Sequence, residues 1–305
     1  MGSDMWKALL PAAIALVTLG LSLVSGEVVK RETEQRQVLA LAHTAEADQE
    51  RAKPAPGTRR SDLPAHTQTA RAVALVIGNA AYPDTGLPLA QPVNNARALA
   101  EVLRDKGFDV ELGENLTKQG IEQAFETFKS KIQPGSPALI FFSGFGIQAG
   151  RQTYMVPVNA HIWNEADVRR AGVSIEPLLT AIDAKGAGAK LIVLDASRRN
   201  PFERRFRSMS AGLAAINGPD DTLVMSTAAP GKVASDGEGD LSPLMDELVG
   251  QIRASGESAE AVFNRTRLAV ARGSHRELVP WVSSSLVQEF SFAPAEPARQ
   301  QHSAR

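Results

Sequence analysis

The chain has 305 residues, 43% of them hydrophobic, which is enough to bury one substantial core. Its 33 basic residues nearly balance its 34 acidic residues, so it lacks the overall positive charge that attracts nucleic acid. The absence of cysteine excludes disulfides, thiolate nucleophiles and cysteine metal sites, and the five histidines lack the paired spacing of zinc ligands. We therefore expect no cofactor, no required metal and no nucleic acid partner.

Residues 1–26 contain an uncharged apolar run from Ala8 to Val24, preceded by Lys7. The run is slightly shorter than the roughly 20 residues of a typical membrane-spanning helix. We predict a signal anchor that makes the protein single-pass in the inner (cytoplasmic) membrane, with its folded domain outside the cytoplasm. Small residues at 24–26 leave a signal peptide as the alternative, and its cleavage would give a secreted or periplasmic protein.

Two further segments lack the apolar periodicity of a folded domain. Residues 27–70 mix acidic and basic side chains with several prolines, and this composition predicts a tether. Residues 293–305 are rich in alanine, proline and polar residues, and we expect a disordered tail. The folded domain should therefore occupy residues 71–292.

Within residues 71–292, apolar runs alternate with helical patterns. The predicted strands are 71–79, 108–115, 137–144, 189–197, 222–228 and 284–292. The predicted helices are 96–107 with a cap at Asn94 or Asn95, 117–132, 175–186, and two more that start near Ser242-Pro243 and Ser258. Alternation of this kind predicts a three-layer α/β fold, with helices on both faces of a mainly parallel sheet of about six strands.

Residues 144–149 read Gly-Phe-Gly-Ile-Gln-Ala, which matches the G-x-G-x-x-A pattern of dinucleotide-binding turns. That motif requires a helix directly after the glycines, because the helix N-terminus holds the pyrophosphate. Here the segment 147–158 contains Gly150 at its centre and predicts a β-hairpin instead. We therefore expect no nucleotide site.

Several blocks occur in order across the predicted domain: "ALVIGNAAY", "NNARALAEVLRDKGFDV", "IFFSGFG", "YMVPVNA", "LIVLDASRRNPF", "STAAPGKVASDGEGDLSP" and "VPWVSSSL". Together they resemble the bacterial caspase-like proteins related to metacaspases and orthocaspases, which belong to peptidase family C14 of clan CD. The resemblance implies a caspase-like fold and descent from cysteine-type endopeptidases.

The resemblance also implies where a catalytic dyad would lie. The general base is the histidine of S-G-H-G after the third strand, and the nucleophile is the cysteine of D-x-C after the fourth. Phe145 and Ser197 occupy these positions. A phenyl ring cannot accept a proton, and a serine hydroxyl is a weak nucleophile without a base. His161 is the one other candidate base, in a predicted exposed loop.

We therefore expect a catalytically inactive pseudopeptidase that binds a peptide or protein partner and is attached to the membrane through residues 8–24. The alternative is a weak serine-dependent or residual endopeptidase of the same family that uses Ser197.

Further site residues follow from the same resemblance. The family's pocket for basic side chains implies Asp195 and Asn95 as pocket residues, with Ser143 beside them, and Asn95 replaces an aspartate. The backbone N–H groups of Gly146 and Ser197 are the implied oxyanion-hole donors.

Two charged segments receive simpler interpretations. The arginines of the loop after the fourth strand are interpreted as a solvated basic surface; they are Arg198, Arg199, Arg204, Arg205 and Arg207. The acidic residues of 236–240 lack the spacing of a calcium loop.

Overall fold

A computed structural model describes residues 70–85, 88–202, 212–235, 237–254 and 256–292. The predicted anchor, tether and C-terminal tail lie outside these residues. Within the described ranges, no helix combines the length and the apolar character needed to cross a membrane.

The described domain is built on a six-stranded sheet with the strand order β2-β1-β3-β7-β8-β9. The strands are β1 (Val73–Gly78), β2 (Asp109–Glu114), β3 (Ala138–Ser143), β7 (Lys190–Asp195), β8 (Thr222–Ser226) and β9 (Trp281–Ser284). The first five are mutually parallel, and β9 runs antiparallel to β8 at the edge. The prediction of a mainly parallel sheet of about six strands is therefore confirmed.

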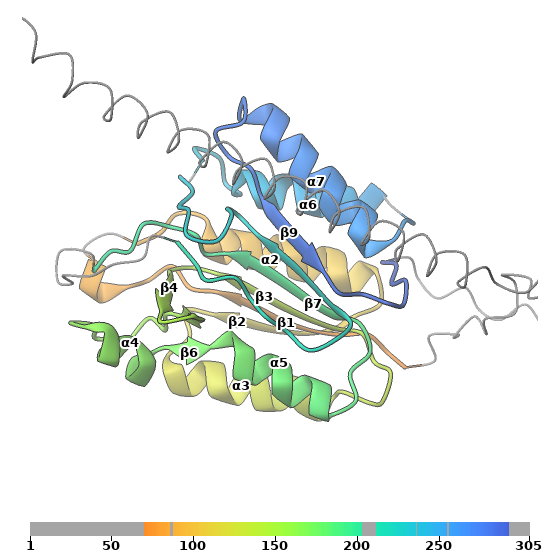
Figure 1. The fold of residues 1–305 in the computed structure, drawn as a ribbon, viewed down its shortest axis with the longest axis horizontal. Coiled ribbons are helices and arrows are strands. Elements are labelled where there is room, and N and C mark those ends of the chain that lie inside the picture. The colour runs from red at the N-terminus through yellow and green to blue at the C-terminus, as the bar shows by residue number, and fades with distance from the viewer. Residues whose placement is uncertain (1–69, 86–87, 203–211, 236, 255, 293–305) are drawn as a thin grey trace, which may run out of the picture. The chain divides into compact units, whose positions relative to one another are not determined.

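Helices cover both faces of this sheet, which gives the predicted three layers (Figure 1). One face carries α2 (Pro92–Asp105), α6 (Pro243–Ala254) and α7 (Ala259–Gly273). The opposite face carries α3 (Lys118–Ser130) and α5 (Ile175–Ala184). All five helices were anticipated by the sequence pattern, although the start of α2 was not.

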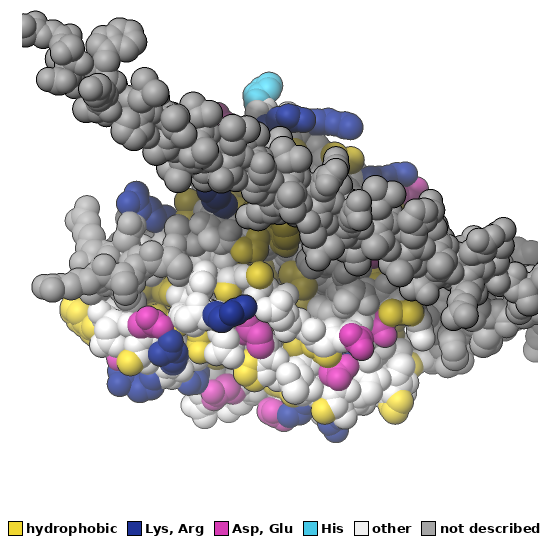
Figure 2. Space-filling model, in the orientation of Figure 1, with side chains coloured by type: hydrophobic (Ala, Val, Ile, Leu, Met, Phe, Trp, Pro, Cys, Tyr) yellow, Lys and Arg dark blue, Asp and Glu magenta, His cyan; other side chains and the backbone are white. Residues whose placement is uncertain are grey.

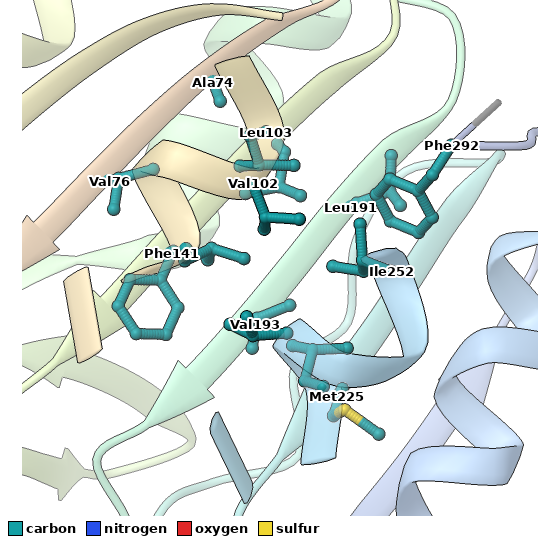
Figure 3. Close-up of a cluster of buried hydrophobic side chains, with 14 of the residues drawn as sticks. Ala74, Val76, Val102, Leu103, Phe141, Leu191, Val193, Met225, Ile252 and Phe292 are labelled. Carbon is teal, nitrogen blue, oxygen red and sulfur yellow. The ribbon is translucent and has the colours of Figure 1, made fainter. Parts of the chain in front are cut away.

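The two faces of the sheet hold two separate hydrophobic clusters, because side chains of a strand point alternately to either side. In β1, Ala74 and Val76 belong to the cluster under α2 and α6, whose packing is shown in Figure 3. Val73, Leu75 and Ile77 belong to the cluster under α3 and α5. A strand buried on both faces has no solvent-facing side, which is why β1, β3 and β7 are apolar runs with polar residues only at the ends of β3 and β7.

A smaller antiparallel sheet follows β3, formed by β4 (Gly146–Ala149), β5 (Gln152–Met155) and β6 (Val173–Ser174). The β4–β5 pair is the predicted hairpin, and no helix follows the glycines of 144–149. The short helix α4 (Glu165–Ala171) and a 3₁₀ turn at Pro83–Thr85 complete the described elements, and neither was predicted.

The predicted helix starts were partly wrong. Thr117 and Ser258 cap α3 and α7 through their hydroxyl oxygens, and α6 begins at Pro243 as expected. In contrast, α2 begins at Pro92, so Asn94 and Asn95 lie in its first turn and cap nothing. Proline is well suited to the first helical position, because its missing N–H would have no partner there.

The last strand was also misplaced. β9 ends at Ser284, before most of the predicted range 284–292. Phe290 and Phe292 are instead buried in the core, where both rings lie 6.2 Å from that of Phe108. Their apolar spacing therefore reflects core packing, and the strand pairing of this segment is limited to an isolated antiparallel bridge between Ser291 and Ser258.

The described surface in Figure 2 carries basic and acidic side chains interspersed, in keeping with the balanced composition. Several lie in local ion pairs, such as Lys131 with Asp109 and Glu111 on the edge of the sheet. Where the described side chains are visible in this view, they form no extended patch of one sign.

Gly78 ends β1 where α2 crosses the sheet, and a β-carbon there would lie 2.4 Å from the Pro92 carbonyl oxygen. We expect Gly78→Ala to lower the free energy of unfolding by about 1–3 kcal/mol, as overpacking does elsewhere. Gly250→Ala in α6 is the control, since a β-carbon there meets nothing within 4 Å. It should stabilise the helix by about 0.5–1 kcal/mol. Urea unfolding of both variants measures these changes in unfolding free energy. Equal changes in the two variants would contradict the packing argument.

Candidate functional site

The predicted site residues meet where β3 and β7 end. These strands are neighbours in register, with Ser143 beside Asp195 in the last pair. Phe145 follows β3 and Ser197 follows β7 by two residues each. The carboxyl edge of the sheet therefore brings together most of the residues that the sequence singled out.

The Asp195 carboxylate is buried and hydrogen-bonded on both oxygens. Its Oδ2 accepts from Asn95 Nδ2 at 2.8 Å and from Ser143 Oγ at 2.9 Å. Its Oδ1 accepts from Thr227 Oγ1 at 2.9 Å. The predicted trio of Asn95, Ser143 and Asp195 is thus one connected group, to which the structure adds Thr227.

Asn95 reaches this group from the first turn of α2. Its Nδ2 also lies within hydrogen-bonding distance of Ser143 Oγ at 3.3 Å, and its Oδ1 accepts from the Ser242 backbone N–H at 3.0 Å. The amide therefore donates to the carboxylate on one side and accepts from the start of α6 on the other. An aspartate here would place a second carboxylate against Asp195, where like charges repel.

Arg198 corrects the interpretation of the basic loop. Its side chain is buried, and its Nη2 lies 3.3 Å from Asp195 Oδ2. Its Nη1 donates to the carbonyl oxygen of Gly144 at 3.0 Å and to that of Asp195. Arg199 is exposed as expected, whereas Arg204, Arg205 and Arg207 lie outside the described residues.

Burial of the Asp195 carboxyl would raise its pKa, because desolvation disfavours the charged form. The Arg198 charge and the hydrogen bonds from Ser143, Thr227 and Arg198 outweigh this effect and hold the pKa below its ordinary value. The buried group is therefore a carboxylate paired with a guanidinium.

Phe145 fills the position of the implied base. It is 7% exposed, and its ring lies 4.8 Å from the ring of Tyr82. The Tyr82 hydroxyl donates to the Val156 carbonyl and accepts from the Phe145 N–H, both at 3.1 Å. A β-carbon at Gly144 would come within 2.5 Å of the Tyr82 hydroxyl oxygen, which explains the glycine.

Tyr82 belongs to a small apolar cluster with Phe145, Tyr154 and Phe202. Burial raises the pKa of the Tyr82 hydroxyl, so this group stays protonated and neutral. It cannot replace the missing base. Tyr82 was not among the predicted site residues, although it lies in one of the blocks that carry the resemblance.

Ser197 is 1% exposed, and its hydroxyl oxygen has no hydrogen-bond partner within the described part of the chain. Its carbonyl accepts from the Ala234 N–H at 2.8 Å, which fixes the backbone but not the side chain. His161 is exposed and its Nδ1 lies 3.6 Å from an Asp84 carboxylate oxygen. The structure therefore does not bring Ser197 and His161 together as a hydroxyl–base pair.

Neither implied oxyanion donor is open to a substrate: the Gly146 N–H is hydrogen-bonded, and Ser197 is buried. The Gly146 N–H donates to the Ala196 carbonyl at 3.2 Å, so this donor is occupied. A β-carbon at Gly146 would lie 2.5 Å from the side chain of Leu213, which is itself buried. The Leu213 carbonyl accepts from the Gly231 N–H at 2.9 Å. The segment around Leu213 therefore covers the sheet edge beside Ala196.

The acidic loop before α6 is held by two side chains at the start of α2, and Asn94 Nδ2 donates to the Asp240 carbonyl at 3.3 Å. Gln91 Nε2 lies 2.8 Å from the carbonyl oxygens of Gly237 and Gly239 and 3.2 Å from that of Leu241. Asp236 lies outside the described residues. The described ranges contain no group of three or more histidine, aspartate or glutamate side chains arranged to hold a metal ion.

Taken together, the geometry holds the Arg198 cation but cannot activate a nucleophile. The buried Asp195 carboxylate is ionised and paired, and the candidate hydroxyl has no base within hydrogen-bonding distance in the described region. Substrate would also have to displace covering segments to reach Ser197, because the residue is buried.

Comparison with known families covers the whole domain that carries these residues. A family model described as a caspase domain matches residues 71–291. No curated protein matches the chain.

The lowered pKa of Asp195 has a consequence for stability against pH. The carboxylate contributes stability that is present above its unfolded pKa of about 3.9 and is lost as the pH falls through the lower folded value. Asp195→Asn should cost about 3–5 kcal/mol at neutral pH, because it leaves Arg198 buried without its carboxylate. The difference from the wild type should shrink progressively below pH ~3.9.

Unfolding free energies measured across acidic and neutral pH test this expectation. Asp105→Asn, at the exposed end of α2, is the control and should change stability by less than about 0.5 kcal/mol. A difference for Asp195→Asn that stays constant with pH would mean that its charge is not involved.

Proposed function

Because the chain belongs to the caspase domain family, we propose that it is a pseudopeptidase, a non-catalytic member that binds a peptide or protein partner without cutting it. Family membership relates the domain to peptidases and does not itself decide whether it is active. The proposal depends on the chemistry of the residues at the carboxyl edge of the sheet.

The observation that carries the proposal is the buried Ser197 hydroxyl without a hydrogen-bond partner in the described region. A serine nucleophile requires a base that removes its proton, and the implied base position holds Phe145, packed against Tyr82. Loss of one member of such a catalytic unit lowers turnover by roughly 10⁴–10⁶-fold. The alternative of a weak endopeptidase that uses Ser197 has no corresponding support.

We also propose the finer classification and the location. The sequence blocks favour the bacterial, metacaspase-related type within the family. The apolar run at residues 8–24 would attach the protein to the cytoplasmic membrane, and residues 27–70 would connect it to the domain. A partner would then be met outside the cytoplasm.

Purified full-length protein should not cleave fluorogenic arginine or lysine peptides, with or without calcium. A fluorophosphonate probe should not label Ser197, because the hydroxyl is buried and has no base within hydrogen-bonding distance. Ser197→Ala should be neutral or stabilising by up to about 1 kcal/mol, since it removes a buried hydroxyl that makes no hydrogen bond.

These measurements separate the two functions. Turnover or labelling that disappears in Ser197→Ala would establish the serine-dependent enzyme and end the pseudopeptidase proposal. Turnover that survives Ser197→Ala would point to a contaminating peptidase.

The location has its own test. In spheroplasts of a Gram-negative host, added protease should degrade the domain, and the intact protein should sediment with membranes after carbonate washing. Deletion of residues 8–24 should keep the protein in the cytoplasm. Protection from protease until lysis would contradict export, and a soluble shortened product would favour the cleaved signal peptide.

A further inference from the structure

The Arg198 guanidinium is enclosed by oxygen acceptors from two strand ends. Asp195 supplies a carboxylate oxygen and its carbonyl, and Gly144 supplies a second carbonyl. A planar guanidinium directs several N–H donors at fixed angles, so it can satisfy a carboxylate and carbonyls at once. An ammonium group is a point charge without this fixed geometry.

These acceptors are held in place by groups other than Arg198. The Asp195 carboxylate is fixed by Asn95, Ser143 and Thr227, and Asn95 is fixed in turn by the Ser242 N–H. The Asp195 carbonyl accepts from the Gly144 N–H at 3.4 Å. The arrangement is therefore built by three strands and two helices, and the arginine is its occupant.

The buried Asp195 carboxylate requires a cation beside it, and Arg198 supplies this charge. Without Arg198, Asp195 would be a buried carboxylate with three neutral donors and no cation. Hydrogen bonds alone compensate a buried charge poorly, so the vacated space would favour another cation of the same shape.

The neighbours of Arg198 in the chain explain why its guanidinium remains beside Asp195. It directly follows Ser197, and four residues later Phe202 is 2% exposed in the apolar cluster with Phe145 and Tyr82. Withdrawal of the guanidinium would therefore disturb both the Ser197 backbone and the packing of Phe202.

We propose that the carboxyl edge of the sheet is a built guanidinium site and that Arg198 is its resident ligand. The wild-type protein is consequently closed to arginine side chains of other molecules, and truncation of Arg198 opens the site to them. This inference rests on the contacts of Arg198 and is independent of whether Ser197 is inert.

The test is rescue of Arg198→Ala in the full-length protein by ethylguanidinium, which replaces the atoms that the substitution removes. Ethylguanidinium at ~10 times its Kd should raise the Tm of this variant by roughly 3–6 °C. Ethylurea has a similar shape without the charge, and propylammonium has the charge without the planar fork. Both should give much smaller shifts at matched ionic strength.

Three matched proteins complete the design. The wild type and Arg199→Ala, an exposed neighbour, should show no ethylguanidinium shift because Arg198 still fills the site. The double variant Asp195→Asn/Arg198→Ala should also show none, since its carboxylate is gone. Isothermal titration of the same proteins should detect binding to Arg198→Ala alone.

Each outcome decides the proposal. If Arg198→Ala is unfolded in buffer, refolding by ethylguanidinium but not by ethylurea supports the site. A folded variant without a selective shift overturns the proposal, as does an unfolded variant that ethylguanidinium does not refold. Equal shifts in the wild type would show that Arg198 does not occupy the binding site. Peptide cleavage enters none of these measurements, so the result is separate from that of the pseudopeptidase proposal.

Discussion

The arrangement at the carboxyl edge depends on one buried negative charge, the carboxylate of Asp195. Five parts of the domain meet at it: α2 through Asn95, β3 through Ser143, the end of β8 through Thr227, the loop of Arg198, and α6 through the link from Ser242 to Asn95. In buried surroundings each of these hydrogen bonds strengthens, and the loss of any one partner leaves a polar group uncompensated. The carboxylate therefore specifies how the helical layer and the strand ends are joined.

The groups around this charge divide into those that bind and those that would react. Asp195, Asn95 and Ser143 form a complete hydrogen-bonded set, whereas Phe145 and Ser197 offer an apolar ring and an isolated hydroxyl. Phe145 and Ser197, the positions implied for catalysis, are buried in the interior, whereas Asp195, the position implied for cation binding, is charged. This division argues against catalysis, which would need the base, while the Asp195 charge is taken up by Arg198.

The sequence predicted the features that arise from local pattern and failed where distant contacts decide. Buried parallel strands are continuous apolar runs, so β1, β3 and β7 were predictable, and their order brought Ser143 and Asp195 together. The predicted cap at Asn94 or Asn95 is wrong, because the Asn95 side chain bonds to Asp195 and Ser242 outside the helix, as a member of the group that the resemblance implies. The prediction that Arg198 is solvated was wrong, because the sequence of an arginine-rich loop does not show which arginine pairs with a buried carboxylate. Phe290 and Phe292 were assigned to a strand because alternation alone does not distinguish pairing from packing.

The link between Ser242 and Asn95 joins residues 147 apart, and that between Asn95 and Asp195 joins residues 100 apart. Contacts so distant in the chain form only after large loops have closed, which slows folding. During synthesis all five parallel strands are complete before α6 exists. Until that helix is present, the Asn95 side-chain Oδ1 lacks the Ser242 N–H donor, and Asp195 depends on a side-chain amide held at one end only. The edge of the sheet is therefore among the last parts of the domain to become rigid, and C-terminally shortened chains should be loose there first.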